Sequence, residues 1–177
     1  MWKAQNKLLN FSRILLTGLL ALLCWHSACG LSTDKQQPAF IQADSATLNH
    51  KTGVCIYRGH VKLTQGTTVI SSDTLTTYSD QKNQLKLAKA VGQPATYTTL
   101  PDNSTIPMVA SAQTINYDPQ QALVTLTGNA KATQGNDSFA GPLIYYNIKL
   151  QTVTTPATEQ GRTTIIIHPG QKVTFPN

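Results

Sequence analysis

The chain has 177 residues, a formal net charge of +6 and only 12% charged residues, a length that suits one domain. Residues 1–30 hold three of the 14 basic residues and none of the eight acidic ones, so the remainder carries 11 − 8, or +3. So weak a positive charge argues against a protein that binds nucleic acid by neutralising phosphates, and we expect no nucleic-acid partner.

The first thirty residues have the pattern of an export signal. Three basic residues precede the apolar run 14–25, and the small residues of 26–30 follow it. We expect cleavage before Leu31, which leaves 31–177 as a single domain. Two alternatives stay open: the apolar segment is retained as a membrane anchor, or Cys29 makes the protein a lipoprotein.

The rest of the chain is typical of short β-strands. Thr, Ser, Val, Ile and Gln recur from 38 to 177, and turn signals rich in Gly, Pro, Asn and Asp fall every few residues. Apolar side chains alternate with polar ones, and residues 84–91 fit a strand as well. One face of the predicted sheet is therefore apolar, and the residues that share its parity are Cys55, Tyr57, Val61, Leu63 and Val69.

One segment occurs twice. RGHVKLTQG at 58–66 is matched by TGNAKATQG at 127–135. We expect the first glycine of each copy, Gly59 and Gly128, to lie at a bend or bulge in a strand. The second glycine of each copy, Gly66 or Gly135, should provide the positive φ of a hairpin. The segment repeats because a strand layer repeats.

No motif of the chain points to catalysis. His50, His60 and His168 fall near turns or on the water-facing parity of a strand, without a partner set such as HExxH or GxSxG. Cys55 lies on the apolar parity, where it should pack as a small hydrophobe. We therefore predict no enzymatic activity, no metal and no cofactor.

Both ends of the predicted domain are themselves strand-like, at 38–43 and at 163–168. Unpaired edge strands at both ends would accept a further strand from another chain. The alternative is ordinary edges blunted by proline, at Pro38, Pro169 and Pro176.

Four segments carry a resemblance to a known family. They are QPAFIQAD (37–44), YRGHVKLTQG (57–66), GQPATY (92–97) and VTLTGNAKATQG (124–135). Together they resemble the OstA-like family of periplasmic lipopolysaccharide-transport proteins. The resemblance implies an all-β fold, an open antiparallel β-jellyroll with an apolar groove between its two sheet faces.

The family also implies a function and partners. Lipid A acyl chains of lipopolysaccharide would travel in the groove, and copies would associate head to tail into a bridge across the periplasm. The bridge would run from the membrane-anchored LptC at the inner membrane to the translocon LptD with LptE at the outer membrane. The implied groove residues are Ala39, Ile41, Tyr57, Val61, Leu63, Leu75, Leu87, Tyr97, Ile115, Tyr117, Leu126 and Ile144. The implied oligomer edges are Phe40, Ile41 and Gln42 at one end, and Ile165, Ile166 and Ile167 at the other.

Two other functions remain open on the sequence. A retained N-terminal anchor would make the chain a membrane-anchored, LptC-like member of the same pathway. A β-sandwich whose polar face binds carbohydrate or a cell surface would instead use the apolar parity only as core.

Overall fold

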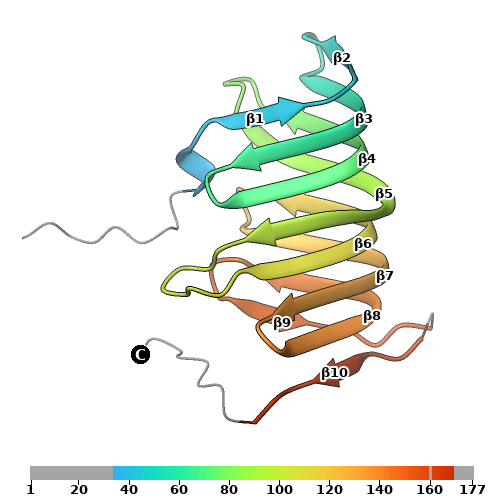
Figure 1. Ribbon diagram of the computed structural model, residues 1–177. Helices are drawn as coiled ribbons and strands as arrows, with labels where there is room; N and C mark the ends of the chain where they lie inside the picture. The colour runs from blue at the N-terminus through green and yellow to red at the C-terminus, as the bar shows by residue number, and fades with distance from the viewer. Residues whose placement is uncertain (1–33, 160, 170–177) are drawn as a thin grey trace, which may run out of the picture.

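The computed structural model describes residues 34–159 and 161–169, and within them the chain is almost entirely β-sheet (Figure 1). A short 3-10 helix, η2 (Asp34–Gln36), precedes the strands. The strands are β1 (Ala39–Gln42), β2 (Ser45–Asn49), β3 (Val54–Gln65), β4 (Thr68–Ser79), β5 (Leu85–Thr99), β6 (Met108–Asp118), β7 (Leu123–Gln134), β8 (Asp137–Asn147), β9 (Thr152–Thr154) and β10 (Thr164–Ile166). The expected strand at 84–91 is confirmed as the first half of β5.

All strands belong to one antiparallel sheet in which each long strand pairs with its neighbours in the chain. The short strands β1 and β2 pair with the two halves of β3, and β10 and β9 pair with the two halves of β8. The sheet does not close, because β3 and β8 do not meet. The prediction of an open antiparallel sheet is confirmed.

Every long strand is interrupted near its middle, and the interruptions line up across the sheet. Pairing skips Gly59 and His60 in β3, and it skips Gly128 and Asn129 in β7. Both pairs of residues have positive φ, with 78° and 46° in β3 and 80° and 48° in β7. The expected bend at the first glycine of each repeat is confirmed. The second glycines have φ of 59° at Gly66 and 60° at Gly135, as a tight hairpin requires.

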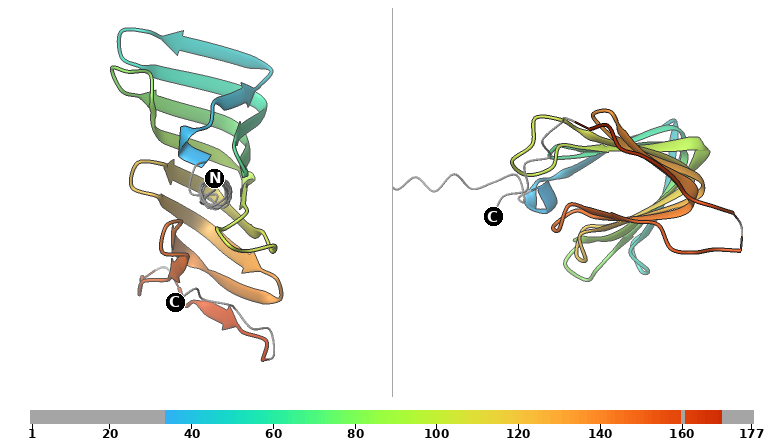
Figure 2. Two further views of the ribbon diagram at one scale, coloured as in Figure 1. Left: turned by 90° about the vertical axis from the view of Figure 1, so that its left-hand side faces the viewer. Right: turned by 90° about the horizontal axis from the view of Figure 1, so that it is seen from below.

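These aligned interruptions fold the sheet over on itself into two layers (Figure 2). The first layer contains β1, the half of β3 that ends at Gln65 and the corresponding halves up to β8, with β10 at its far edge. The second layer contains β2, the half of β3 that starts at Val54 and the remaining halves, with β9 at its far edge. We call the side where the strand ends of both layers lie, opposite the bends, the open side.

Apolar side chains from both layers fill the space between them. The first layer contributes five alanines, namely Ala95, Ala110, Ala112, Ala130 and Ala132, beside larger residues such as Leu63, Ile70 and Tyr97. The second layer contributes Ala88 and Ala90 beside a greater share of larger residues, namely Leu75, Ile115, Tyr117, Val124, Leu126, Ile144 and Tyr146. Burial of this apolar surface is the main favourable contribution to folding. Within residues 34–159 and 161–169, no α-helix covers an outer face of the sheet.

Two parity predictions are wrong, one because of a hairpin and one because of an interruption. Val69 lies on the outward face of β4, because the two-residue turn at Gly66 and Thr67 pairs Leu63 with Ile70 and so places Ile70 toward the interior. The second case follows from an interruption, since skipping an odd number of residues exchanges the inward and outward positions in the part of the strand beyond it. In the first half of β5 the inward residues are Ala88 and Ala90, so that Leu87 lies outside.

Among the described residues, no helix has the length and apolar character needed to span a membrane. The predicted export signal at 1–30 lies outside the described residues.

Candidate functional site

The interior between the layers gathers most of the residues expected to line a groove. Tyr97, Leu63 and Val61 project from the first layer, and they face side chains of the second layer. All eight of the following are 0–2% exposed: Val61, Leu63, Leu75, Tyr97, Ile115, Tyr117, Leu126 and Ile144. This part of the interior is packed against itself, so a guest molecule would have to separate the two layers.

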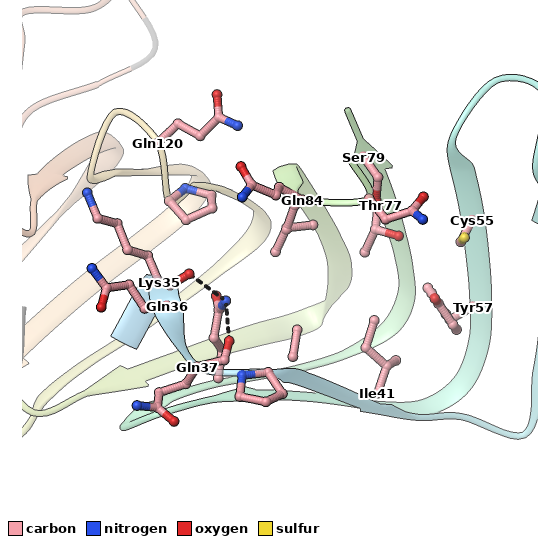
Figure 3. Close-up of a pocket in the computed structure, with 16 residues that line it drawn as sticks. Lys35, Gln36, Gln37, Ile41, Cys55, Tyr57, Thr77, Ser79, Gln84 and Gln120 are labelled. Carbon is pink, nitrogen blue, oxygen red and sulfur yellow. Dashed lines mark hydrogen bonds between the residues drawn. The ribbon is translucent and has the colours of Figure 1, made fainter. Parts of the chain in front are cut away.

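The interior opens into a cavity of about 990 Å³ near β1 (Figure 3). Ile41 and Tyr57 contribute apolar surface to its wall, and Ala39 lies at its rim. Cys55 lines the same cavity. The predicted groove residues thus form two connected sets, one around an open cavity and one in the packed interior beyond it.

Leu87 is the exception among the expected groove residues. It pairs with Tyr78, a side chain 38% exposed on the outer face of β4. Leu85, two residues earlier, packs against the core and lines the cavity, because an irregularity in pairing follows it. Leu87 is therefore removed from the candidate lining, and Leu85 takes its place.

A hydrogen-bond network closes the first-layer side of the cavity. The Gln65 amide donates to the carbonyl of Gln37 at 3.0 Å, while the Tyr117 hydroxyl of the second layer donates to Gln65 Oε1 at 3.2 Å. Asp34 accepts from the backbone N–H of Thr67 at 2.9 Å and from its hydroxyl at 2.6 Å. These bonds hold the segment around η2 against the strand ends. No sequence motif indicates this network, since it joins residues that are 28 to 52 positions apart.

Three tyrosines cross the interior on the open side. The rings of Tyr97 and Tyr117, from opposite layers, lie 6.1 Å apart and are tilted by 43°. Burial raises the pKa of Tyr117 to about 12 and that of Tyr146 to about 12, and it raises the pKa of Tyr97 still further. All three hydroxyls therefore remain protonated at physiological pH. Tyr146 was not among the residues expected to line the groove.

The two expected edges lie at opposite ends of the stack of strands (Figure 1). Phe40 of β1 is 67% exposed, whereas Ile41 faces the cavity and Gln42 is exposed. At the other end, Ile165 and Ile166 are 50% and 49% exposed, and Ile167 follows β10 at 68%. Each end of the sheet thus presents an unpaired strand that carries exposed apolar side chains.

The three histidines of the described residues lie at separate exposed positions, with His50 in the turn after β2. His60 lies at the outer bend, where its Nδ1 is 2.8 Å from Asp44 Oδ2, and this hydrogen bond raises the pKa of His60 above 6.5. His168 lies beside Asp137 at the C-terminal edge. Within residues 34–159 and 161–169, no three His, Cys, Asp or Glu side chains gather as metal ligands would.

Comparison with known proteins identifies the family. A family model described as "LptA/(LptD N-terminal domain) LPS transport protein" matches residues 40–152. The chain belongs to this LptA family. The match covers the strands from β1 into β9, and so it includes both layers and the interior between them.

Individual LptA-family relatives agree with the match. The chain is 36% identical to the lipopolysaccharide export system protein LptH of Pseudomonas aeruginosa, over 92% of this chain and 87% of that protein. It is 29% identical to LptA of Escherichia coli K12, over 96% of this chain and 90% of LptA. A crystal structure of Pseudomonas aeruginosa LptH, titled as the LptA-homologous periplasmic component of the lipopolysaccharide transport device, superposes with a TM-score of 0.71 at 33% identity. That superposition covers 77% of this chain and 99% of the LptH chain. These LptA-family relatives are transport proteins by name, in agreement with the prediction that the chain is not an enzyme.

Proposed function

We propose that the chain is a periplasmic carrier that shields the lipid A acyl chains of lipopolysaccharide as they pass between the inner and the outer membrane. The observation that carries the proposal is the apolar interior between two sheet layers, which opens at the cavity near β1 and lies between two unpaired strand edges. Its relatives are named as lipopolysaccharide export proteins, which supports the same substrate.

The energetics of acyl chains favour such an interior. Transfer of a methylene group out of water is worth about 0.8 kcal/mol, so one chain of a dozen carbons gains at most about 10 kcal/mol before ordering costs. An acyl chain would not cross water unaided against that difference. Movement along an apolar interior exchanges one contact for a similar one, and the barrier is correspondingly low. In this proposal, separation of the alanine-rich first layer from the second makes room for the chains.

The unpaired edges support the proposed partners. β1 with β2 at one end and β10 with β9 at the other can each accept a strand from a second copy, so that successive interiors join into one path. The same edges would pair with an LptC-like protein at the inner membrane and with an LptD/LptE-type translocon at the outer membrane. Cleavage of residues 1–30 stays a prediction. It would release the protein from the membrane, whereas a retained segment would anchor it.

A charge placed in the cavity wall tests the proposed function. Tyr57→Asp should lower the affinity for purified lipopolysaccharide at least tenfold, because a carboxylate beside the acyl chains would lose its hydration. Tyr57 is only partly buried, so the variant should fold, whereas Asp at the fully buried Leu63 would unfold the protein. Binding is measured by displacement of a fluorescent fatty-acid probe, and folding is checked by circular dichroism.

Tyr78→Asp is the matched control, since Tyr78 lies on the outer face of the neighbouring strand. It should bind lipopolysaccharide as the wild type does. Equal affinities of the two variants, both folded, would contradict binding between the layers.

A further inference from the structure

Two tyrosine hydroxyls in the interior make no hydrogen bond within the described part of the chain. Tyr97 is 0% exposed and Tyr146 is 2% exposed, and neither hydroxyl is hydrogen-bonded to any of the described residues. Tyr97 belongs to the first layer and Tyr146 to the second, so both lie on the surfaces that face each other across the interior.

Their polar neighbours are already engaged. The Tyr117 hydroxyl donates to Gln65, and the hydroxyls of Thr68 and Thr99 lie 3.2 Å from each other. Both threonines are close enough to lower the pKa of Tyr97, although burial outweighs them. None of these groups is in hydrogen-bonding geometry with the Tyr97 hydroxyl. Tyr97 and Tyr146 thus keep a free donor in an apolar space.

A free donor at such a position destabilises the folded chain. A buried tyrosine hydroxyl normally finds a partner, and phenylalanine would fill the same space without an unpaired polar group. Two such donors in the interior that forms the proposed lipid path therefore indicate an acceptor that arrives with the ligand.

We propose that the hydroxyls of Tyr97 and Tyr146 donate hydrogen bonds to the carbonyl oxygens of fatty-acyl ester or amide linkages when a lipid lies between the layers. This inference rests on the proposed function and adds a polar recognition step to it. A neutral carbonyl enters a dry interior at far lower cost than a charged group.

The surrounding charges favour a carbonyl over a phosphate. Burial raises the pKa of Tyr146, and the negative charge of Asp102 raises it further. A phosphate beside the Tyr146 hydroxyl would be repelled by the Asp102 carboxylate, whereas a neutral acceptor would not.

The open side gives a lipid access to both hydroxyls. In the described part of the chain no strand pairing joins the layers there, so side-chain hydrogen bonds link them instead. The Tyr117 hydroxyl bonds to Gln65, and the Gln151 amide donates to the carbonyl of Asp102 at 2.8 Å. Separation of the layers breaks these bonds without disturbing the sheet.

The test compares two lipids that differ only in the carbonyl. The probes are a monoacylglycerol and its 1-O-alkyl ether analogue of equal chain length, with purified lipopolysaccharide as a third ligand. Wild-type protein should bind the ester about threefold to tenfold more tightly than the ether for each hydroxyl engaged. The variant Tyr97→Phe/Tyr146→Phe should bind both probes equally and should melt at the wild-type temperature or above. Tyr145→Phe, which removes a hydroxyl from the opposite face of β8, should keep the wild-type preference.

The outcomes separate this inference from the proposed function. A double variant that keeps the ester preference, or one that melts below the wild type because its hydroxyls have structural partners, overturns the inference. So does a wild type that binds lipopolysaccharide but does not distinguish ester from ether. If the wild type binds none of the three ligands, the proposed function fails, and this inference fails with it.

Discussion

Gln65 and Gln134 occupy the same position in the two copies of the repeated segment, and their side chains make equivalent bonds. The Gln65 amide donates to the carbonyl of Gln37 at 3.0 Å, and the Gln134 amide donates to the carbonyl of Ile106 at 3.3 Å. Each glutamine thus holds an adjacent non-strand segment against the end of its strand. Both copies of the repeat therefore contain this contact as well as the two glycines. Each copy specifies a strand, the bend within it and the hydrogen bond that holds a neighbouring segment at its end.

The first glycine of each repeat should be intolerant of a side chain. A Cβ at Gly59 would overlap the Asp44 carboxylate, and the left-handed backbone there disfavours any L-residue. We expect Gly59→Ala to lower the free energy of unfolding by at least about 1–2 kcal/mol, measured by urea denaturation. When Asp44→Ala is already present, Gly59→Ala should lower the free energy of unfolding by less, because only the cost of the left-handed backbone conformation remains. A fully tolerated Gly59→Ala would show that β3 does not bend at this position.

At the scale of elements, the short terminal strands determine how the sheet ends. β1 and β2 are one edge strand divided at the bend, where the N–H of Asp44 donates to the carbonyl of Gly59 at 3.0 Å. At the opposite edge, β9 and β10 likewise pair with the two halves of β8, but residues 155–163 separate them in the chain. In each edge strand, alternate residues direct their N–H and C=O groups away from the sheet, and a strand of another chain could pair with them.

Proline substitution in β1 should distinguish the two sides of that strand. Of the adjacent residues Phe40 and Ile41, one directs its N–H toward β3 and the other toward the free edge. We expect proline at the residue whose N–H points to the free edge to weaken self-association at least tenfold, with an unchanged melting temperature. Pro at the inward position should lower stability instead. Analytical ultracentrifugation and thermal melts of both variants provide the measurement. If both proline variants self-associated as the wild type does, β1 would be excluded as the strand through which copies pair.

At the scale of the whole molecule, the two edges differ, so any contact between them is heterologous. One end of the stack carries Phe40 and Leu48, and the other carries Leu150 and Ile165 to Ile167, all of them exposed. Heterologous contacts build an open assembly when the rotation from one copy to the next does not close a ring. An open assembly is what a bridge of variable length requires.

Mixing two blocked variants tests this polarity. One variant carries the edge-blocking proline in β1, and the other carries Ile166→Pro in β10. Each alone should remain monomeric at concentrations where the wild type forms longer species. An equimolar mixture should form heterodimers and nothing larger, because only one compatible pair of edges remains, and native mass spectrometry would count the subunits. Homodimers of either variant would contradict head-to-tail pairing.

Alternation, turn residues and the duplicated segment were sufficient to predict an all-β chain, the bends at Gly59 and Gly128 and most of the inward side chains. These features depend on interactions between near neighbours, such as the period of a strand or the φ that a glycine permits, and they can be read from the sequence. The resemblance to a known family added the open jellyroll and its groove.

The outward placement of Val69 depended on the two-residue turn that pairs Leu63 with Ile70, and that of Leu87 depended on the three residues that pairing skips in the middle of β5. The network of Asp34, Gln65 and Tyr117 and the unpartnered hydroxyls of Tyr97 and Tyr146 likewise arise only when the folded sheet brings its two layers together. Residues far apart in the chain meet between the layers through packing. The periodicity of a single strand does not say which side chains of the other layer its own side chains will contact.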